Sequence, residues 1–162
     1  MIENNWITLV KPNKVDYKIS DNKKFGTVVI EPLEKGFGTT LGNALRRVLL
    51  SSLQGTAITS IKINGVLHEF STIEGVREDV TDIIMNLKNV TFNSKSNHTQ
   101  KLSLNIKGPK EVLSSDFDDN PEVEIVDKEM VIMNVDSNRE VNLEIFLDVN
   151  KGYISAEKNK DN

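Results

Sequence analysis

Residues 36–52, GFGTTLGNALRRVLLSS, place a short glycine-rich turn directly before a helical pattern that has two distinct faces. Leu41, Leu45 and Val48 recur at helical spacing and predict one apolar stripe, which Ala44 and Leu49 widen. The other faces carry an amide, two adjacent arginines and a leucine: Asn43, Arg46, Arg47 and Leu50. Because arginine beside an aliphatic anchor is typical of protein interfaces, this helix is expected to need partners on both faces.

The first segment of the chain, residues 1 to about 53, has too little apolar surface to close a core by itself. We expect it to hold two strands, one of them at Thr27 to Glu31. The helix should follow, and a hydroxyl of Thr39 or Thr40 is suited to cap it. Two strands and one helix of this size need further packing to be stable. The segment therefore requires a partner chain or another part of its own chain.

Residues 54–162 predict a strand-rich domain that carries one helix. Asn64 and Gly65 indicate a hairpin turn that leads into a returning strand through Phe70. Ser71 and Glu74 have capping-box spacing, so a helix is expected over residues 71–89. Alternating apolar residues predict strands at 101–107, 123–126, 130–135 and 141–149, with loops at 92–100 and 114–121. The predicted fold class is α+β, in two parts that divide after residue 53.

Composition excludes several kinds of functional site. The 162 residues include no cysteine and only two histidines, His68 and His98, which are far apart in the sequence. Disulfides and thiolate metal sites are excluded, and we expect neither a metal nor a cofactor. A net charge of −4 argues against a surface that holds nucleic acid nonspecifically. The N-terminus lacks a signal-peptide pattern and no apolar run is long enough to span a membrane, so a cytoplasmic location is expected.

Other functions fit residues 36–52 less well than a protein-binding helix does. The spacing of Gly36, Gly38 and Gly42 is one residue longer than that of a dinucleotide-binding loop. In addition, Gly42 lies inside the helical pattern. A nucleic-acid-binding helix would depend on Arg46 and Arg47 alone, which also fit the simpler interpretation of solvated surface charges. An enzyme site would need a nucleophile, a base and oxyanion donors, and no such set is present. The residues alone favour a protein-interaction module.

Two longer blocks identify a family. Residues 31–52, EPLEKGFGTTLGNALRRVLLSS, and residues 65–88, GVLHEFSTIEGVREDVTDIIMNLK, closely resemble the N-terminal domain of the bacterial DNA-directed RNA polymerase alpha subunit. The resemblance implies that residues 1–53 are the first part of a dimerisation domain and that residues 54–162 are most of an inserted strand-rich domain. It also implies a homodimer that docks the beta and beta prime subunits. Such a subunit is part of a nucleotidyltransferase but carries no catalytic residue.

The resemblance further implies roles for individual residues. Contacts of the dimer and its core are implied for the apolar stripe: Phe37, Leu41, Leu45, Val48 and Leu49. Docking of the large subunits is implied for the other helix faces: Asn43, Arg46, Arg47 and Leu50. It is likewise implied for a beta-contacting segment and a beta-prime contact in the second domain: His68, Glu69, Ser71, Thr72 and Lys88. Arginine suits docking because its planar guanidinium can donate two parallel hydrogen bonds to one acceptor group.

Members of this family continue beyond the position that corresponds to residue 162. Their remaining part completes both domains and adds a small domain that binds DNA and activators. We therefore expect no upstream-DNA binding from this chain, and weakened or altered dimerisation. A rival hypothesis is a standalone interaction module derived from the family, which would fail to bind beta. A nucleotide-binding enzyme is a third hypothesis, which nucleotide-dependent stabilisation would support.

Overall fold

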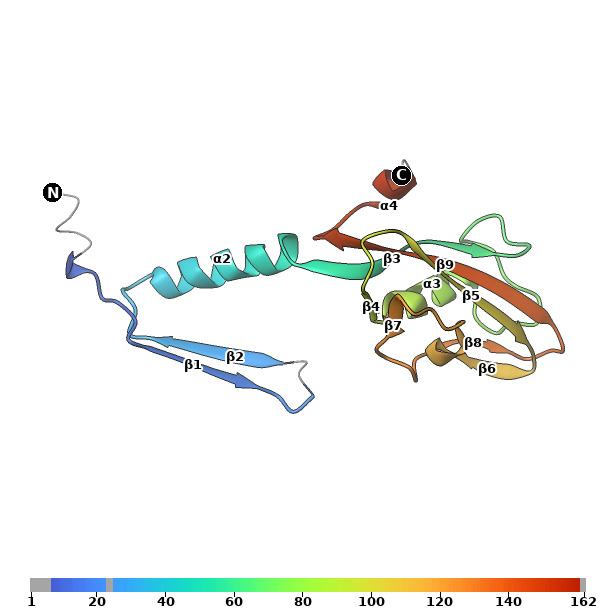
Figure 1. Cartoon of the computed structure of the whole chain (residues 1–162), viewed down its shortest axis with the longest axis horizontal. Helices are drawn as coiled ribbons and strands as arrows, with labels where there is room; N and C mark the ends of the chain where they lie inside the picture. Colours follow the sequence, from blue (N-terminus) through green and yellow to red (C-terminus); the bar gives the residue numbers. More distant parts are fainter. Residues whose placement is uncertain (1–6, 23–24, 161–162) are drawn as a thin grey trace. The chain divides into compact units, whose positions relative to one another are not determined.

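The computed structural model describes residues 7–22 and 25–160, and the chain divides into two compact units, Met1–Leu50 and Ser51–Asn162. The first is called the N-terminal unit here and the second the strand-rich unit. The N-terminal unit contains β1 (Lys14–Ile19), β2 (Gly26–Glu31) and α2 (Phe37–Ser51) (Figure 1). The strand-rich unit contains β3 (Gln54–Ile63), α3 (Val80–Lys88), β4 (Phe92–Ser94), β5 (Gln100–Lys107), β6 (Lys110–Leu113), η1 (Ser114–Asp116), β7 (Val123–Ile125), β8 (Val131–Val135), β9 (Glu140–Lys151) and α4 (Ala156–Lys160).

The N-terminal unit has the two strands and one helix that the sequence predicts. β1 and β2 form an antiparallel two-stranded sheet in which Val15 lies opposite Ile30 and Tyr17 lies opposite Val28. Successive residues of a strand point to opposite faces, so these four side chains share one face of the sheet. The other face carries polar side chains, among them Lys14 and Asp16. The Lys14 ammonium lies 2.6 Å from the Asp16 carboxylate.

The strand-rich unit is built on a five-stranded sheet in the order β5-β9-β3-β4-β7, with a separate two-stranded sheet of β6 and β8. The central pair is long: β3 and β9 run antiparallel from Gln54 opposite Lys151 to Ile63 opposite Leu143. β5 pairs with the other side of β9 along its whole length. The observed mixture of a strand-rich sheet with helices agrees with the predicted α+β class. Figure 1 shows α3 lying against the strands of this unit.

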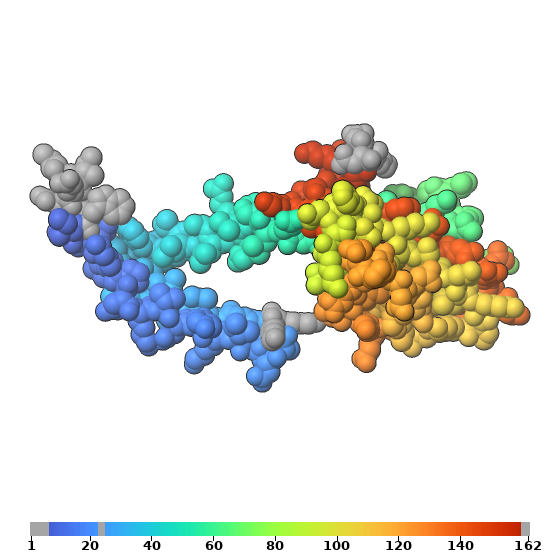
Figure 2. Space-filling view, in the orientation of Figure 1, coloured from blue at the N-terminus to red at the C-terminus, as the bar shows by residue number. Residues whose placement is uncertain are grey.

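The core of the strand-rich unit lies under the strands whose alternation is clearest in the sequence. The predicted inward positions are all buried, namely Leu102, Leu104, Ile106, Val141, Leu143, Ile145 and Leu147. α3 adds Val80, Ile83 and Leu87 from one face, and β8 adds Ile132 and Met133. In the space-filling view, the segments from β4 to β9 pack into a continuous body (Figure 2). The predicted strands at β5, β7, β8 and β9 are thus confirmed.

The predicted hairpin after β3 is wrong. Gly65 does adopt a positive φ of 82°, and the Val66 N–H donates to the Ile63 carbonyl 3.2 Å away, so a turn forms there. The chain then continues without a strand through Phe70. β3 instead pairs with β9, and the Asn64 N–H extends that ladder by donating to the Asn142 carbonyl. The alternating apolar residues of β9 offer β3 a more extensive buried face than residues 66–70 do.

The helix expected over residues 71–89 begins later, at Val80. Its N-cap is Asp79, whose Oδ1 accepts a hydrogen bond of 2.7 Å from the Asp82 N–H. The predicted capping box does not form, because Ser71 Oγ donates to the His68 carbonyl and Glu74 pairs with Arg139 at 2.8 Å. Both side chains are therefore engaged outside the helix.

Residues 75–78 are held by β8 and the turn that follows it, which explains why they are not helical. The Arg77 N–H donates to the Asn134 carbonyl, and the Glu78 carboxylate accepts from both the N–H and the Nδ2 of Asn134, each at 2.7 Å. The Asp136 N–H donates to the carbonyl of Gly75, whose φ is 83°. These tertiary hydrogen bonds satisfy backbone groups that a longer helix would otherwise have paired.

The two predicted loops also contain regular structure. Phe92 begins β4 and is buried in the core, so the expected loop at 92–100 starts only after Ser94. In the segment 114–121, η1 occupies residues Ser114–Asp116, and Phe117 is buried. β6 was not predicted. Its sequence, KEVL, does not alternate apolar and polar residues, so it shows no strand pattern.

Asp116 anchors η1, and this predicts an acid-sensitive contribution to stability. Burial alone would raise the pKa of Asp116, but hydrogen bonds from Lys110 Nζ (2.6 Å) and the Leu113 N–H (2.9 Å), with the Lys110 charge, hold the pKa below its usual value. A lowered pKa in the folded state stabilises the fold above the unfolded-state pKa, and this stabilisation is lost as pH falls through the folded value. Asp116→Asn should therefore lower the free energy of unfolding by about 1 kcal/mol at pH 7. Urea unfolding at pH 7 and at pH 2.5 measures this, and a difference that persists unchanged at pH 2.5 would contradict it.

Candidate interaction surfaces

α2 begins at Phe37, two to three residues before the predicted start, and it has an unusual exposure. Gly36 precedes it with a φ of 90°, and the Phe37 N–H donates to the Glu34 carbonyl at 3.0 Å. Thr40 is not the cap: its hydroxyl donates back to the Gly36 carbonyl from within the first turn. None of the 15 residues of α2 is buried. The helix therefore carries both of its predicted faces on the surface of the N-terminal unit.

The predicted apolar stripe of α2 is present and exposed. Its members recur at i, i+4, i+8 and i+11 or i+12 and so share one side of the helix: Phe37, Leu41, Leu45, Val48 and Leu49. Leu45 and Val48, near the middle of the stripe, are each about half exposed. An apolar face of this length in water is a feature of surfaces that bind another protein.

The second face of α2 brings together the four residues predicted to dock a partner. Asn43, Arg46, Arg47 and Leu50 follow the spacing i, i+3, i+4 and i+7, which aligns them along one side of a helix. All four are exposed, and Leu50 has 64% of its surface accessible. An aliphatic side chain between guanidinium groups combines apolar contact with directed hydrogen bonding, which suits protein recognition.

The β1–β2 sheet adds a third exposed surface, which the sequence analysis did not identify. The face shared by Val15, Tyr17, Ile19 and Val28 is exposed, and Tyr17 has 74% of its surface accessible. A two-stranded sheet is marginally stable by itself, so this apolar face also calls for a partner. The alternation of apolar and polar residues in KVDYKI was the signal that could have revealed β1.

The predicted docking residues His68, Glu69, Ser71 and Thr72 lie in the irregular segment between β3 and α3. Hydrogen bonds fix this segment to the start of α3: Thr81 Oγ1 donates to the Glu69 carbonyl at 2.9 Å, and the Val80 N–H donates to the Ser71 carbonyl at 3.1 Å. The side chains of His68 and Glu69 are exposed. The structure thus brings these residues together in a held loop, rather than in the strand that was expected.

Two apolar residues of the same loop were missed by the sequence analysis. Leu67 is 97% exposed and Phe70 is 81% exposed, although a strand would have turned one of them inward. Beside the loop lies a cleft of about 270 Å³ whose walls include Ile61, Val66 and Ile84. Large apolar side chains presented by a loop with fixed carbonyls can act as anchors for a partner.

Lys88 ends α3 and is exposed, whereas the loop of His68 to Thr72 is attached to the other end of this helix. The residues of α2 belong to the N-terminal unit, and Lys88 and the loop belong to the strand-rich unit.

Among the residues that the structure describes, no group of three or more histidine, cysteine or acidic side chains is placed to hold a metal ion. No helix within residues 7–22 and 25–160 is both long and apolar enough to cross a membrane.

Comparison with protein families identifies the strand-rich unit. A family model described as the RNA polymerase Rpb3/RpoA insert domain matches residues 61–162. The match begins inside β3 and runs through the rest of the strand-rich unit, which is more than half of the chain. This is the domain of an RNA polymerase subunit that assembles with other polymerase subunits.

Proposed function

Because the chain belongs to the RNA polymerase Rpb3/RpoA insert-domain family, we propose that it is an alpha-type assembly subunit of DNA-directed RNA polymerase. In this proposal two copies form a dimer that docks the beta and beta prime subunits, and the chain contributes no catalytic residue to nucleotide transfer. The observation that carries the proposal is α2, a helix with an apolar face, an arginine-leucine face and no buried residue. We place this role in the cytoplasm.

Exposed apolar surface supports the proposed dimerisation. The stripe of α2 and the apolar face of β1–β2 leave leucine, valine, isoleucine and tyrosine side chains in water within the N-terminal unit. Burial of such surface yields roughly 25 cal/mol per Å², so a second chain that covers both faces would be strongly favoured. The proposal therefore assigns these two surfaces to the dimer.

The second face of α2 and the loop of the strand-rich unit are proposed to dock the large subunits. Arg47 and Leu50 are assigned to the beta subunit, with Asn43 and Arg46 beside them. The loop residues His68, Glu69, Ser71 and Thr72 are assigned to beta as well, and Lys88 to beta prime. The exposure of both surfaces supports these assignments, and so does the loop's attachment to α3. The family match favours a polymerase subunit over a standalone interaction protein.

Replacing Arg47 by alanine is expected to weaken binding to the beta subunit by about 2 kcal/mol or more, the range of an interface hot spot. The guanidinium would no longer donate paired hydrogen bonds to an acceptor on beta. The measurement is the dissociation constant for beta, from a titration followed by fluorescence anisotropy or calorimetry. About a thirtyfold loss of affinity corresponds to this free energy.

Lys18→Ala provides the matched control, since Lys18 is an exposed cation of the same unit on the polar face of β1. This control variant should bind beta as the parent chain does. Equal affinity of the Arg47→Ala variant and the parent would show that the second face of α2 does not dock beta.

A further inference from the structure

The five-stranded sheet has one edge, β5, that its own chain covers and another edge, β7, that its own chain covers only at Val123. At the β5 edge, the Asp118 N–H donates to the Ser103 carbonyl at 2.9 Å, and Asn120 Nδ2 lies 3.5 Å from the Lys101 carbonyl. The segment after η1 therefore caps β5. β7, at the other edge, has β4 as its only neighbour in the sheet.

The register of β7 determines which of its backbone groups face outward. The Lys95 N–H donates to the Glu122 carbonyl and the Val126 N–H donates to the Thr91 carbonyl, so residues 122 and 126 face the β4 side. Hydrogen-bonded pairs alternate along an antiparallel ladder, which puts Glu124 in the same set. The backbone groups of Val123 and Ile125 must then point away from β4. The Val123 N–H is taken by the Asn120 carbonyl at 3.1 Å. Val123 forms an isolated antiparallel bridge with Asn120, so its carbonyl also faces Asn120. The N–H and the carbonyl of Ile125 thus form a short open edge.

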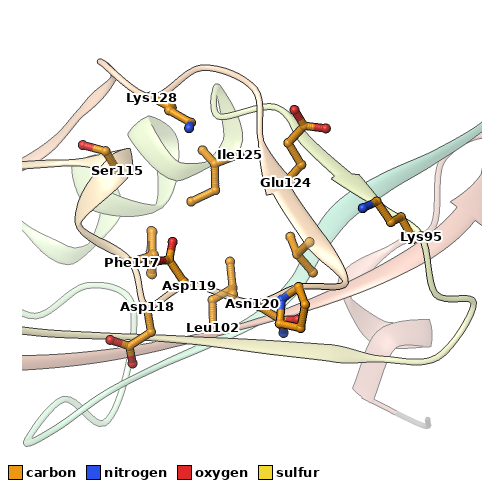
Figure 3. A pocket seen from close by; sticks show the side chains of 12 residues that line it. Lys95, Leu102, Ser115, Phe117, Asp118, Asp119, Asn120, Glu124, Ile125 and Lys128 are labelled. Atoms are coloured by element: carbon orange, nitrogen blue, oxygen red, sulfur yellow. The ribbon is translucent and has the colours of Figure 1, made fainter.

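This open edge lies beside a cavity of about 390 Å³. The cavity is on the side of β7 away from β4, bounded by β7, β5 and the segment that follows η1 (Figure 3). Its apolar part includes Leu102, Phe117, Val123 and Ile125, of which the first three are buried. The volume is sufficient for one large aliphatic side chain with its backbone. An extended segment laid along β7 could place such a side chain there.

The charges at the rim indicate what should flank this apolar side chain. Figure 3 shows the ammonium groups of Lys95 and Lys128 turned toward the cavity from its two ends, whereas the carboxylate of Asp118 is turned away. Lys95 lies at the Val123 end, because Ser94 pairs with Val123, and Lys128 follows the Ile125 end. Within the part of the chain that the structure describes, neither lysine forms an ion pair. Asp119 turns its carboxylate to the same opening and can accept a peptide N–H (Figure 3).

We propose that β7 and its cavity bind an extended peptide segment of a partner protein, with an aliphatic residue in the cavity and an acidic residue two positions away on each side. Residues i−2, i and i+2 of a strand point to the same face, so the two acids would reach the two lysines. Backbone pairing with β7 would supply affinity and the cavity would supply specificity. This site is independent of the proposed dimer and docking surfaces.

A second copy of the chain fits this edge less well. In a symmetric antiparallel pairing of two β7 strands centred on Glu124, the two Glu124 side chains would lie directly opposite one another. Like charges in that position destabilise a strand pair. β7 is also only three residues long, which limits pairing between identical edges.

The test uses the full chain and a blocked, fluorescein-labelled pentapeptide, Glu-Thr-Leu-Thr-Glu. Fluorescence anisotropy should show saturable binding, and the amide signals of Ile125 and its neighbours should shift in nitrogen-15 correlation spectra. Lys95→Glu and Lys128→Glu should each weaken binding roughly tenfold, since each reversal replaces an attraction by a repulsion. Lys107→Glu, an exposed lysine on β5, should leave the affinity unchanged.

Three results would overturn the proposal. The first is no binding of the pentapeptide at millimolar concentration. The second is equal binding of a pentapeptide in which lysines replace the two glutamates, because charge recognition would then be absent. The third is concentration-dependent broadening of the Val123 to Val126 signals in the free chain, which would assign this edge to a second copy.

Discussion

Replacing Ile145 by alanine is expected to lower the free energy of unfolding by about 4 kcal/mol. Ile145 is fully buried at the centre of β9, where it lies opposite Ile61 of β3 and Leu102 of β5. Removing three carbon atoms there forfeits apolar burial and leaves a cavity that tightly paired strands on both sides cannot close. Urea unfolding followed by circular dichroism measures the change.

Leu67→Ala is the matched control, because it removes a similar aliphatic side chain that is almost fully exposed. Its effect should stay within about 0.5 kcal/mol. If the Ile145 and Leu67 variants lost equal stability, β9 would not lie at the centre of the core.

Gly108→Ala should destabilise the strand-rich unit by about 3 kcal/mol. A Cβ at this position would lie 2.2 Å from the Ser137 carbonyl oxygen and 2.4 Å from Val135 Cγ1. The oxygen has little freedom to move, since it accepts from the Arg139 N–H at 2.7 Å. Gly108 is itself held, because its N–H donates to the Arg139 carbonyl at 2.9 Å. The same urea titration measures the loss.

Gly55→Ala is the control for this second variant, since a Cβ at Gly55 on β3 would meet no atom within 4 Å. The added methyl group restricts the unfolded chain, so this variant should be as stable as the parent or more stable by up to about 1 kcal/mol. Similar losses for both glycine variants would contradict the close packing of residues 135–139 against Gly108.

Much of the strand-rich unit could be predicted from the sequence because its longer strands are buried on one face. β5 alternates apolar and polar residues from Leu102 to Lys107, and β9 does so from Val141 to Ile145, and every predicted inward residue is buried. Such alternation is a local signal, and it was sufficient to predict these strands and their buried side chains. The exposed faces of α2 could be predicted for the same reason, since helical spacing alone separates the apolar stripe from Arg47 and Leu50.

The errors lie where distant residues decide the local structure. Asn64-Gly65 forms its turn, yet the partner of β3 is β9, which lies much later in the chain. The helical pattern from Val76 onward is broken because Asn134 and Asp136 bind residues 75–78. β6 was missed because its sequence, KEVL, does not alternate apolar and polar residues. The exposure of Leu67 and Phe70 was missed because of the wrong partner for β3. The predicted return strand would have buried one of them, but β3 pairs with β9 instead.

The roles given to individual residues depend on the polymerase family more than on local pattern. Physical reasoning about α2 identifies two surfaces that need partners, but it does not name those partners. The match of residues 61–162 to the Rpb3/RpoA insert domain supplies a polymerase context. The assignment of each face to the dimer, to beta or to beta prime remains a prediction that Arg47→Ala begins to test.

Light scattering of the purified chain, alone and mixed with the beta subunit, tests the central claim most directly. The assembly role predicts a particle with the mass of two chains, which shifts to the mass of two chains plus one beta when beta is added. If the chain is a monomer that still binds beta, the proposed docking role is supported and the proposed dimer is wrong. A chain that is folded by circular dichroism and whose mass does not change with beta present would contradict the account.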